Sequence, residues 1–383
     1  MIVAGIALKM SRQKLLCVLL MCFGFSLVYA AAQTQPAAGP PAAAPASIHR
    51  PGETGRAAAA PPPVVATALA DPQTPEEFFA RARALSDLEA SGIPFHLKAT
   101  YVASGDTEFT GNGTYEEWWQ SKDFWRKEAT LGDYKYVEMM NNDKHTVYGS
   151  SDYVPLRLRQ AMQAIEIGHP LKENAAKKWK MQKKTLGGVE LTVISAKYPV
   201  ARSDAHPPSR VDYFTAKGIL RIFQANGTLT LYNNWQPFQK LLVSRSLQVI
   251  SGKDRVLDIS IDSLETLNPK NTAKLPVVPD GLNAQPFYDG QPTVVWPQLE
   301  YRPLPDNPTG LSPGEKPMVL IGATIDQNGN LREPYIEESA GSLLDRAALH
   351  AFSQFRFKPA TLNGKPVAVE ISYPYIFINQ STP

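Results

Sequence analysis

The sequence predicts an α+β protein with two folded domains, a large antiparallel half-barrel-like β domain with helices and a small ββαβ domain. Short runs with a period of two recur between residues 95 and 263, and a strand–turn–strand–helix–strand pattern follows residue 314. The chain has 33 prolines in 383 residues, too many for one compact unit. We therefore expect folded parts joined by extended linkers.

Residues 1–30 have the features of a secretory signal or a membrane anchor. Lys9, Arg12 and Lys14 precede an apolar run from Leu15 to Ala32, in which Val28-Tyr29-Ala30 resembles a cleavage site. Because a membrane span needs about 17 to 25 apolar residues, cleavage and retention as an anchor both fit this run. Met10 would open a more conventional signal than Met1.

Both cysteines, Cys17 and Cys22, lie in this apolar run, so the rest of the chain has no disulfide and no cysteine-based metal site. Lipidation of Cys22 is a third hypothesis for the N-terminus, although Met21 stands where lipoprotein signals prefer a small residue. The formal net charge of +3 disappears without residues 1–30. No basic stripe remains to suggest a nucleic-acid partner.

Two proline-rich stretches divide the remainder of the chain. Residues 31–72 are mostly Ala, Pro and Gly, which predicts an extended tether, and residues 268–313 form a second proline-rich linker. The expected domains are therefore 74–267 and 314–380.

The middle domain, 74–267, begins with a helix start signal and continues as strands. Thr74 is placed to cap a helix, with Pro75 in its first position and Glu77 three residues after the cap. From Phe95 to Tyr101 the period changes to two, and a helix is expected from Pro155 to Ile167. Further strands are expected at Gly113–Trp119, Phe124–Ala129, Tyr134–Met139, Leu191–Ala196, Val211–Thr215, Ile219–Gln224, Thr228–Tyr232, Leu241–Ile250 and Arg255–Ser263. Turns are expected at Asn112-Gly113, Gly187-Gly188 and Asn226-Gly227.

One long meandering sheet with helices against a single face would form a half-barrel with an aromatic-rich concave side. The runs Gly111 to Trp119, Phe124 to Glu128 and Tyr134 to Tyr136 resemble lipoprotein-carrier domains of the LolA type. That resemblance implies a bound lipid or acyl chain. A closed aromatic core without a ligand is the alternative.

The C-terminal domain, 314–380, begins with an apolar strand from Met318 to Ile325 and a turn at Asn328-Gly329. Pro334 lies in the return strand, Leu331 to Glu338, and belongs at a sheet edge because it cannot donate a ladder hydrogen bond. The final strand, Val367 to Phe377, should pair beside the first. The predicted strand order is second, first, third.

A helix is expected between these strands. Ser342 and Asp345 have the spacing of a capping box, and apolar residues then recur at helical spacing. The residues of this apolar face are Leu344, Ala348, Ala351 and Phe355.

These motifs resemble the C-terminal domain of the TonB family, over residues about 290–380. The matching positions are Asp326, Gly329, Leu344 to Ala348, Phe355 to Ala360 and Gly364 to Pro366. The resemblance implies that the final strand binds an extended segment of a partner, typically an outer-membrane transporter, by strand addition.

The candidate partner-binding residues are Val367, Val369, Ile371 and Tyr373, with the main-chain groups around them. The alternative is that these side chains only pack the sheet on the helix. An uncleaved N-terminus would also permit contact with an inner-membrane motor complex and support energised transport. However, the apolar run Leu15 to Ala32 lacks the histidine that energy-transducing members carry.

No sequence motif indicates an enzyme, a cofactor or a metal site. Ser342, Asp345 and His350 do not form a triad, because Asp345 and His350 diverge on one helix. The acidic pairs Glu76-Glu77, Glu116-Glu117 and Glu337-Glu338 are interpreted as solvated faces or strand ends. The sequence therefore predicts a binding protein of the cell envelope, in the periplasm or anchored in the inner membrane. A carrier of lipid or another hydrophobic ligand and an adaptor without ligand are the alternatives.

Overall fold

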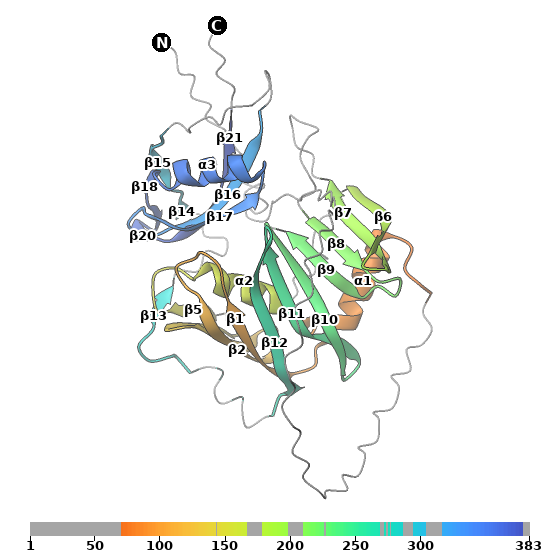
Figure 1. Cartoon of the computed structure of the whole chain (residues 1–383). Coiled ribbons are helices and arrows are strands. Elements are labelled where there is room, and N and C mark those ends of the chain that lie inside the picture. The colour runs from red at the N-terminus through yellow and green to blue at the C-terminus, as the bar shows by residue number, and fades with distance from the viewer. Residues whose placement is uncertain are drawn as a thin grey trace, which may run out of the picture. The chain divides into compact units, whose positions relative to one another are not determined.

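The structure is a computed structural model that describes residues 70–142, 144–166, 178–197, 210–225, 227–268, 272, 275, 277–285, 294–303 and 316–377 (Figure 1). The expected signal or anchor, 1–30, and nearly all of the first proline-rich linker, 31–72, lie outside the described residues. No helix in the described ranges is both long and apolar enough to cross a membrane.

Three short helical segments belong to the middle domain: α1 (Pro75–Ser86), the 3₁₀ turn η2 (Glu89–Ser91) and α2 (Leu156–Ile165). The predicted capping box is confirmed. The N–H of Glu77 donates to Thr74 Oγ1 at 3.3 Å, and the N–H of Thr74 donates to the Glu77 carboxylate at 3.2 Å. The helix then buries Phe78, Phe79 and Ala82.

Thirteen antiparallel strands of the described residues form the sheet of the middle domain. They are β1 (Phe95–Ala103), β2 (Gly111–Ser121), β3 (Phe124–Leu131), β4 (Tyr134–Asn141), β5 (Lys144–Gly149), β6 (Lys178–Leu186), β7 (Val189–Lys197), β8 (Arg210–Phe214), β9 (Leu220–Ala225), β10 (Thr228–Phe238), β11 (Leu241–Ser251), β12 (Asp254–Thr266) and β13 (Asn283–Gln285).

The sheet is not one continuous meander. Its order is β13-β5-β4-β3-β2-β1-β12-β11-β10-β9-β8-β7-β6, so β1 pairs with β12. The sheet therefore consists of two meanders, β1–β5 and β6–β12, which join where β1 pairs with β12. Every predicted strand is present; β5, β6 and β13 are additional.

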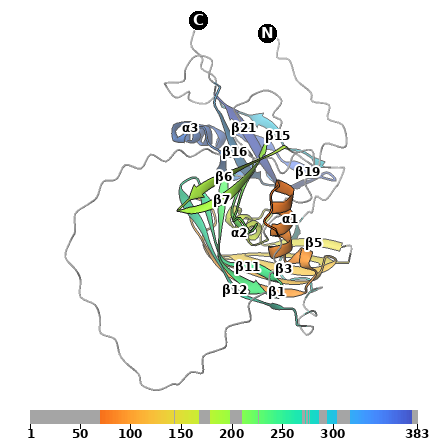
Figure 2. The ribbon, with the colours of Figure 1, turned by 90° about the vertical axis from the view of Figure 1, so that its right-hand side faces the viewer.

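The sheet curves around α1 and α2, which both lie on its concave face (Figure 2). Alternate residues of β1, from Phe95 to Ala103, are buried and face these helices, as the period of two predicts. The Phe79 ring contacts Trp179 and Phe214 at centroid distances of 4.8 and 5.7 Å. The α+β half-barrel is thus observed for the described residues of this domain.

The prediction of a turn at Asn112-Gly113 is wrong. Both residues lie in β2 and pair with Val102 and Tyr101 of β1. A Cβ at Gly113 would lie 2.2 Å from the Tyr101 ring. This glycine therefore makes room for an aromatic ring on the neighbouring strand and does not turn the chain.

The C-terminal domain has one helix, α3 (Ser342–Phe352), and a set of short strands. The strands are β14 (Val294–Val295), β15 (Gln298–Tyr301), β16 (Met318–Ile325), β17 (Leu331–Glu338), β18 (Arg356–Lys358), β19 (Ala360–Leu362), β20 (Lys365–Val367) and β21 (Val369–Ile376). The main sheet has the order β17-β16-β21, which confirms the predicted order. Inside the stretch 268–313, β14 pairs with β19, and β15 pairs with β18.

The Asp326-to-Gly329 turn shows why the motif needs these two residue types. The Asp326 carboxylate accepts hydrogen bonds from the Asn328 and Asn330 N–H groups, both at 2.9 Å. Gly329 has φ +84°, and a Cβ there would lie 2.0 Å from the Phe357 carbonyl oxygen. The turn therefore requires an acceptor at its first position and a glycine where β18 passes.

Two local predictions in this domain are corrected. Ser342 is the first helical residue and not the cap: Gly341 is the N-cap, and Asp345 accepts hydrogen bonds from the Ser339 hydroxyl and the Ala340 N–H. The predicted single strand from Val367 to Phe377 is two strands, because β20 ends at Val367 and pairs with β19 while β21 pairs with β16.

Candidate functional site

The strand β21 is an edge, since the described strands include none on its second side. The Phe377 N–H donates to the Pro317 carbonyl at 2.9 Å, which identifies this residue pair as hydrogen-bonded across the β16–β21 ladder. Hydrogen-bonded pairs alternate along an antiparallel ladder, so Val369, Ile371, Tyr373 and Tyr375 direct their main-chain groups toward β16. The main-chain groups of Glu370, Ser372, Pro374 and Ile376 point to the free edge.

Pro374 leaves this edge one donor short. It pairs with Leu320 in the register and has no N–H, while its carbonyl still points outward. The free edge thus offers N–H groups at Glu370, Ser372 and Ile376, with a gap between the last two.

The side chains of the four predicted partner-binding residues face the domain's own core. Val367 and Val369 are buried, and Ile371 and Tyr373 pack against the same cluster as Phe352 and Phe355 of the helical segment. The Tyr373 ring lies 5.2 Å from the Phe355 ring between centroids. Neither the side chains nor the main-chain groups of Val369, Ile371 and Tyr373 therefore face the free edge. That edge is formed by main-chain groups of Glu370, Ser372, Pro374 and Ile376.

A second candidate site lies inside the half-barrel, where charged side chains form a row. Glu117 of β2 lies opposite Lys127 of β3, which lies opposite Glu138 of β4. Glu117 and Lys127 are 4% and 6% exposed, so the interpretation of Glu116-Glu117 as a solvated pair is wrong for Glu117. Consecutive strand residues face opposite sides, and Glu117 shares the concave side with Tyr115.

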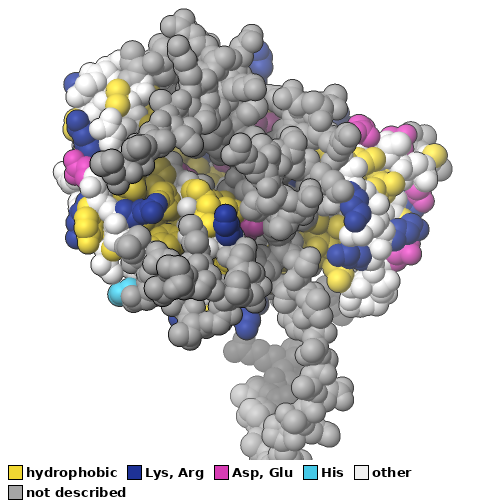
Figure 3. All heavy atoms as spheres, turned by 90° about the horizontal axis from the view of Figure 1, so that it is seen from above, with side chains coloured by type: hydrophobic (Ala, Val, Ile, Leu, Met, Phe, Trp, Pro, Cys, Tyr) yellow, Lys and Arg dark blue, Asp and Glu magenta, His cyan; other side chains and the backbone are white. Residues whose placement is uncertain are grey.

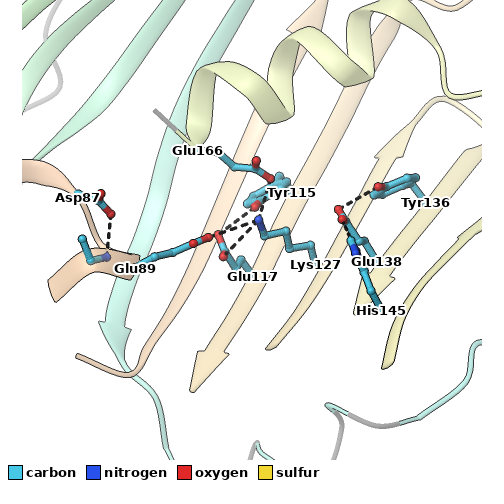
Figure 4. Close-up of polar contacts among 10 residues, drawn as sticks. Asp87, Glu89, Tyr115, Glu117, Lys127, Tyr136, Glu138, His145 and Glu166 are labelled. Carbon is cyan, nitrogen blue, oxygen red and sulfur yellow. Dashed lines mark hydrogen bonds and ion pairs between the residues drawn. The ribbon is translucent and has the colours of Figure 1, made fainter. Parts of the chain in front are cut away.

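Lys127 is surrounded by carboxylates from several elements (Figure 4). Its Nζ lies 3.0 Å from Glu166 Oε1, 3.5 Å from Glu89 Oε1 and 3.9 Å from Glu117 Oε1. Glu166 caps the C-terminal end of α2, and Glu89 begins η2. The helical segments therefore bring two of the acidic groups over the row on the sheet.

Burial and charge shift the ionisation of this cluster. Burial, with the nearby Glu89 and Glu166 carboxylates, raises the pKa of Glu117 to about 8 although Lys127 opposes the shift. Burial would lower the pKa of Lys127, but the carboxylates around it raise that pKa above its usual value. Glu138 has a lowered pKa despite burial, because it accepts hydrogen bonds from His145 and Tyr136.

One oxygen of Glu117 has no hydrogen-bond partner within the described part of the chain. Tyr115 Oη donates to Glu117 Oε2 at 2.9 Å, whereas Oε1 is buried and accepts no hydrogen bond, with Lys127 Nζ 3.9 Å away. The same residue lines a cavity of about 350 Å³ between the helical segments and the sheet. The apolar part of its lining is formed by Leu88, Phe95, Leu97, Ile165, Val243, Leu247 and Ile261.

Sequence patterns alone do not predict the site residues Glu117, Lys127, Glu89 and Glu166. The sequence does contain a signal for Glu117. The alternation that places Tyr115 and Trp119 on the inner face of β2 also places Glu117 there. The pairing of Glu117 with Lys127 needs the β2–β3 register, and the approach of Glu166 needs tertiary packing.

The other two acidic pairs differ from each other in exposure. Glu76 and Glu77 are exposed, as predicted. Glu337 and Glu338 end strand β17, which agrees with the strand-end alternative, but at 6% and 4% exposure they are not solvated. Glu337 accepts hydrogen bonds from the Tyr335 and Ser372 hydroxyls, both at 3.0 Å.

The described residues contain no group of three or more His, Cys, Asp or Glu side chains arranged to hold a metal ion. The Asp345 carboxylate accepts hydrogen bonds from Ser339 and Ala340, so it is committed to the start of α3. On the face seen in Figure 3, basic side chains of the described residues lie in separate patches among hydrophobic ones.

Comparison with known proteins identifies the C-terminal segment. Residues 314–378 match the family described as Gram-negative bacterial TonB protein C-terminal. The C-terminal domain is TonB-like. The match covers the turn at Asp326, the helix α3 and the edge strand β21, and it agrees with the resemblance seen in the sequence. No curated protein matches the chain.

Three solved structures are similar to about half of the chain. They are a DUF1329 family protein from Desulfovibrio piger, a putative outer membrane lipoprotein-sorting protein domain from Vibrio parahaemolyticus and a LolA superfamily protein from Nitrosomonas europaea. Their identities are 10%, 8% and 9%, and their TM-scores are 0.30, 0.28 and 0.30. Each match covers 52% of this chain. In the same order, the matches cover 95%, 96% and 97% of the three solved chains. At these TM-scores the likeness supports no conclusion about a ligand.

Proposed function

We propose that this chain is a cell-envelope protein whose TonB-like domain binds an extended segment of a partner as an additional strand beside β21. The partner is an outer-membrane transporter or another envelope protein. The protein acts in the periplasm, either released from residues 1–30 or anchored through them in the inner membrane. Coupling to an inner-membrane motor, and hence energised transport, requires that those residues remain attached.

The observation that supports this proposal is the row of outward main-chain groups on β21. Glu370, Ser372 and Ile376 each present an N–H and a carbonyl to the free edge. A backbone hydrogen bond contributes about 0.5–1.5 kcal/mol net, so a few of them can hold a peptide of suitable length. The domain needs no catalytic group for this function.

The test is a titration of the full-length chain with extended peptides derived from outer-membrane transporters, followed by amide chemical shifts. We expect the largest shifts in Val369 to Ile376. Amides of this strand that stay unperturbed at saturating peptide would contradict the proposal.

Two variants of one residue separate the main chain from the side chain. Ser372→Pro removes an outward N–H without removing a hydrogen bond to β16, and it should weaken peptide binding about threefold to tenfold. It also removes the hydroxyl that donates to Glu337, so Ser372→Ala is the matched control. The control should bind the peptide like the unaltered chain.

A second candidate function is carriage of a lipid, an acyl chain or another hydrophobic ligand by the middle domain. The observation that favours it is the cavity of about 350 Å³, which lies at the lower end of ligand-pocket sizes. Uptake of a neutral fluorescent hydrophobic probe by delipidated protein tests it. Val243→Phe, which places a ring in the cavity wall, should reduce uptake, whereas Val102→Phe on the exposed face should not. Failure of the unaltered chain to take up the probe would remove this candidate.

A further inference from the structure

We propose that the half-barrel cavity binds a single-chain amphiphile with a primary ammonium head, which donates a hydrogen bond to Glu117 Oε1. This inference rests on the carrier function proposed for the middle domain and specifies the ligand class. The apolar chain lies against Phe95, Leu97, Val243, Leu247 and Ile261.

The Glu117 oxygen that accepts no hydrogen bond supplies the first argument. Glu117 is 4% exposed and lines the cavity, and its Oε1 has no hydrogen-bond donor within the described residues. A buried acceptor without a donor costs about 1–3 kcal/mol, more if charged. A ligand that brings an N–H to this atom removes that cost.

The charges around the cavity supply the second argument. Four acidic side chains line it, Asp87, Glu89, Glu117 and Glu166, against one basic side chain, Arg83. Arg83 is paired with Asp87 at 3.3 Å. A cationic head is therefore complementary to this wall, and a carboxylate head would meet repulsion.

Lys127 is not available as a counter-ion for an anionic ligand. Its ammonium group is buried and already lies within 4 Å of three carboxylates, at 3.0, 3.5 and 3.9 Å. It is absent from the residues that line the cavity. A lipid carboxylate would have to displace one of these glutamates to reach it.

The exposure of the carboxylates indicates from which side a ligand head would enter the cavity. The Glu89 and Glu166 side chains are 54% and 33% exposed, whereas Glu117 is buried. The acidic groups therefore extend from the solvent to Glu117 Oε1, which accepts no hydrogen bond. The volume of about 350 Å³ suits one chain and not a lipid with several acyl chains.

Binding of an ammonium head is coupled to a proton. Because the pKa of Glu117 is raised to about 8, the carboxyl holds its proton near pH 7 in the free protein, and an ammonium ligand favours its release. Affinity should therefore rise between pH 6 and pH 8. The charged and titratable groups that face Glu117 are Arg83 and Asp87 at the end of α1, Glu89 of η2, Tyr115 of β2, Lys127 of β3, Glu138 of β4 and Glu166 at the end of α2.

The test is calorimetric titration of the delipidated full-length chain with decylamine, 1-decanol and decanoate, each below its micelle concentration. We expect one decylamine per chain, bound at least tenfold more tightly than decanol or decanoate, and release of up to one proton at pH 7. Decyltrimethylammonium, which has no N–H, should bind more weakly than decylamine.

Glu117→Gln and Glu116→Gln form a matched pair, since the two residues are adjacent on β2 but face opposite sides of the sheet. Glu117→Gln should weaken decylamine about tenfold to a hundredfold and leave decanol unchanged; Glu116→Gln should change neither. Equal effects of the two variants, or decanoate binding as tightly as decylamine, would overturn the inference. If decanol binds without any preference for the amine, only this inference fails; if no probe binds, the carrier function fails with it.

Discussion

The sheets of the two domains differ on the face that packs against helices. The TonB-like domain packs apolar residues of β16, such as Val319, Ile321 and Ile325, against the aromatic side chains of the α3 segment. The middle domain instead places Glu117 and Lys127 on the inner face of its sheet. The apolar packing of the TonB-like domain stabilises a fold whose proposed binding groups lie at the edge of its sheet.

The charged interior of the middle domain is costly by comparison. A buried ion pair is often no more stable than the apolar residues that could replace it, whereas removal of one partner is strongly destabilising. Such a cluster is therefore better explained by specificity than by stability. This difference between the domains can be tested by substitution.

The largest expected effect is that of Lys127→Met. Without the ammonium group, the Glu117, Glu166 and Glu89 carboxylates lose their shared counter-ion, and the free energy of unfolding should fall by about 3–5 kcal/mol at pH 8. Denaturant unfolding followed by tryptophan fluorescence measures it. Lys135→Met, at an exposed position of β4, is the control. A loss below about 1 kcal/mol in Lys127→Met would contradict the role of Lys127 as the shared counter-ion of the buried carboxylates.

Asp326→Ala probes the C-terminal domain in the same way. The Asn328 and Asn330 N–H groups lose their acceptor, so local stability should fall by about 2–3 kcal/mol. Amide hydrogen exchange of residues 316–377 reports it. Gln327→Ala, in the same turn but exposed, should leave exchange unchanged; equal protection in both variants would show that the turn does not depend on the carboxylate.

Glu117→Gln should change the pH dependence of stability by up to about 5 kcal/mol, the free-energy equivalent of a pKa raised from 4.5 to about 8. Since the folded pKa of about 8 exceeds the usual 4.5, the folded state holds this proton, and its stabilising contribution is full below pH 4.5 and lost as the pH rises through 8. The unaltered chain should therefore lose stability relative to the variant between pH 5 and pH 9. Parallel curves for the two proteins would refute the assigned pKa, and Glu116→Gln serves as the control.

The smallest expected effect is that of Pro374→Ala on peptide binding. Alanine restores an outward N–H at the gap in the β21 edge, and affinity should rise about twofold to fivefold if the bound strand passes this position. The titration described for Ser372→Pro measures it. An unchanged affinity would confine the bound segment to one side of residue 374.

Sequence patterns predicted much of the fold because local chemistry determines it. The capping box at Thr74, the alternation along β1 and the Asp326 turn depend on neighbours within a few residues. The strand β6 was missed because its sequence, Lys178 to Leu186, is rich in lysine and almost wholly exposed, as suits the edge of a sheet.

Other features depend on contacts that no local pattern contains. The pairing of β1 with β12 joins segments far apart in the sequence, and it turns an expected meander into two. The interior site was missed for a different reason: adjacent acidic residues were treated as one pair, although Glu116 and Glu117 face opposite sides of β2. The predicted place of the final strand beside β16 is confirmed, whereas the outward direction of Pro374 depends on the hydrogen-bond phase of that pairing, which no local pattern contains.

Pro374 also has a consequence for the protein in concentrated solution. A long edge with a complete donor row can pair with the same edge of another copy, and natural proteins commonly prevent such aggregation with proline or charge. Pro374, with Glu370 on the same edge, gives β21 both devices. The strand proposed to accept a partner is thus protected against accepting itself.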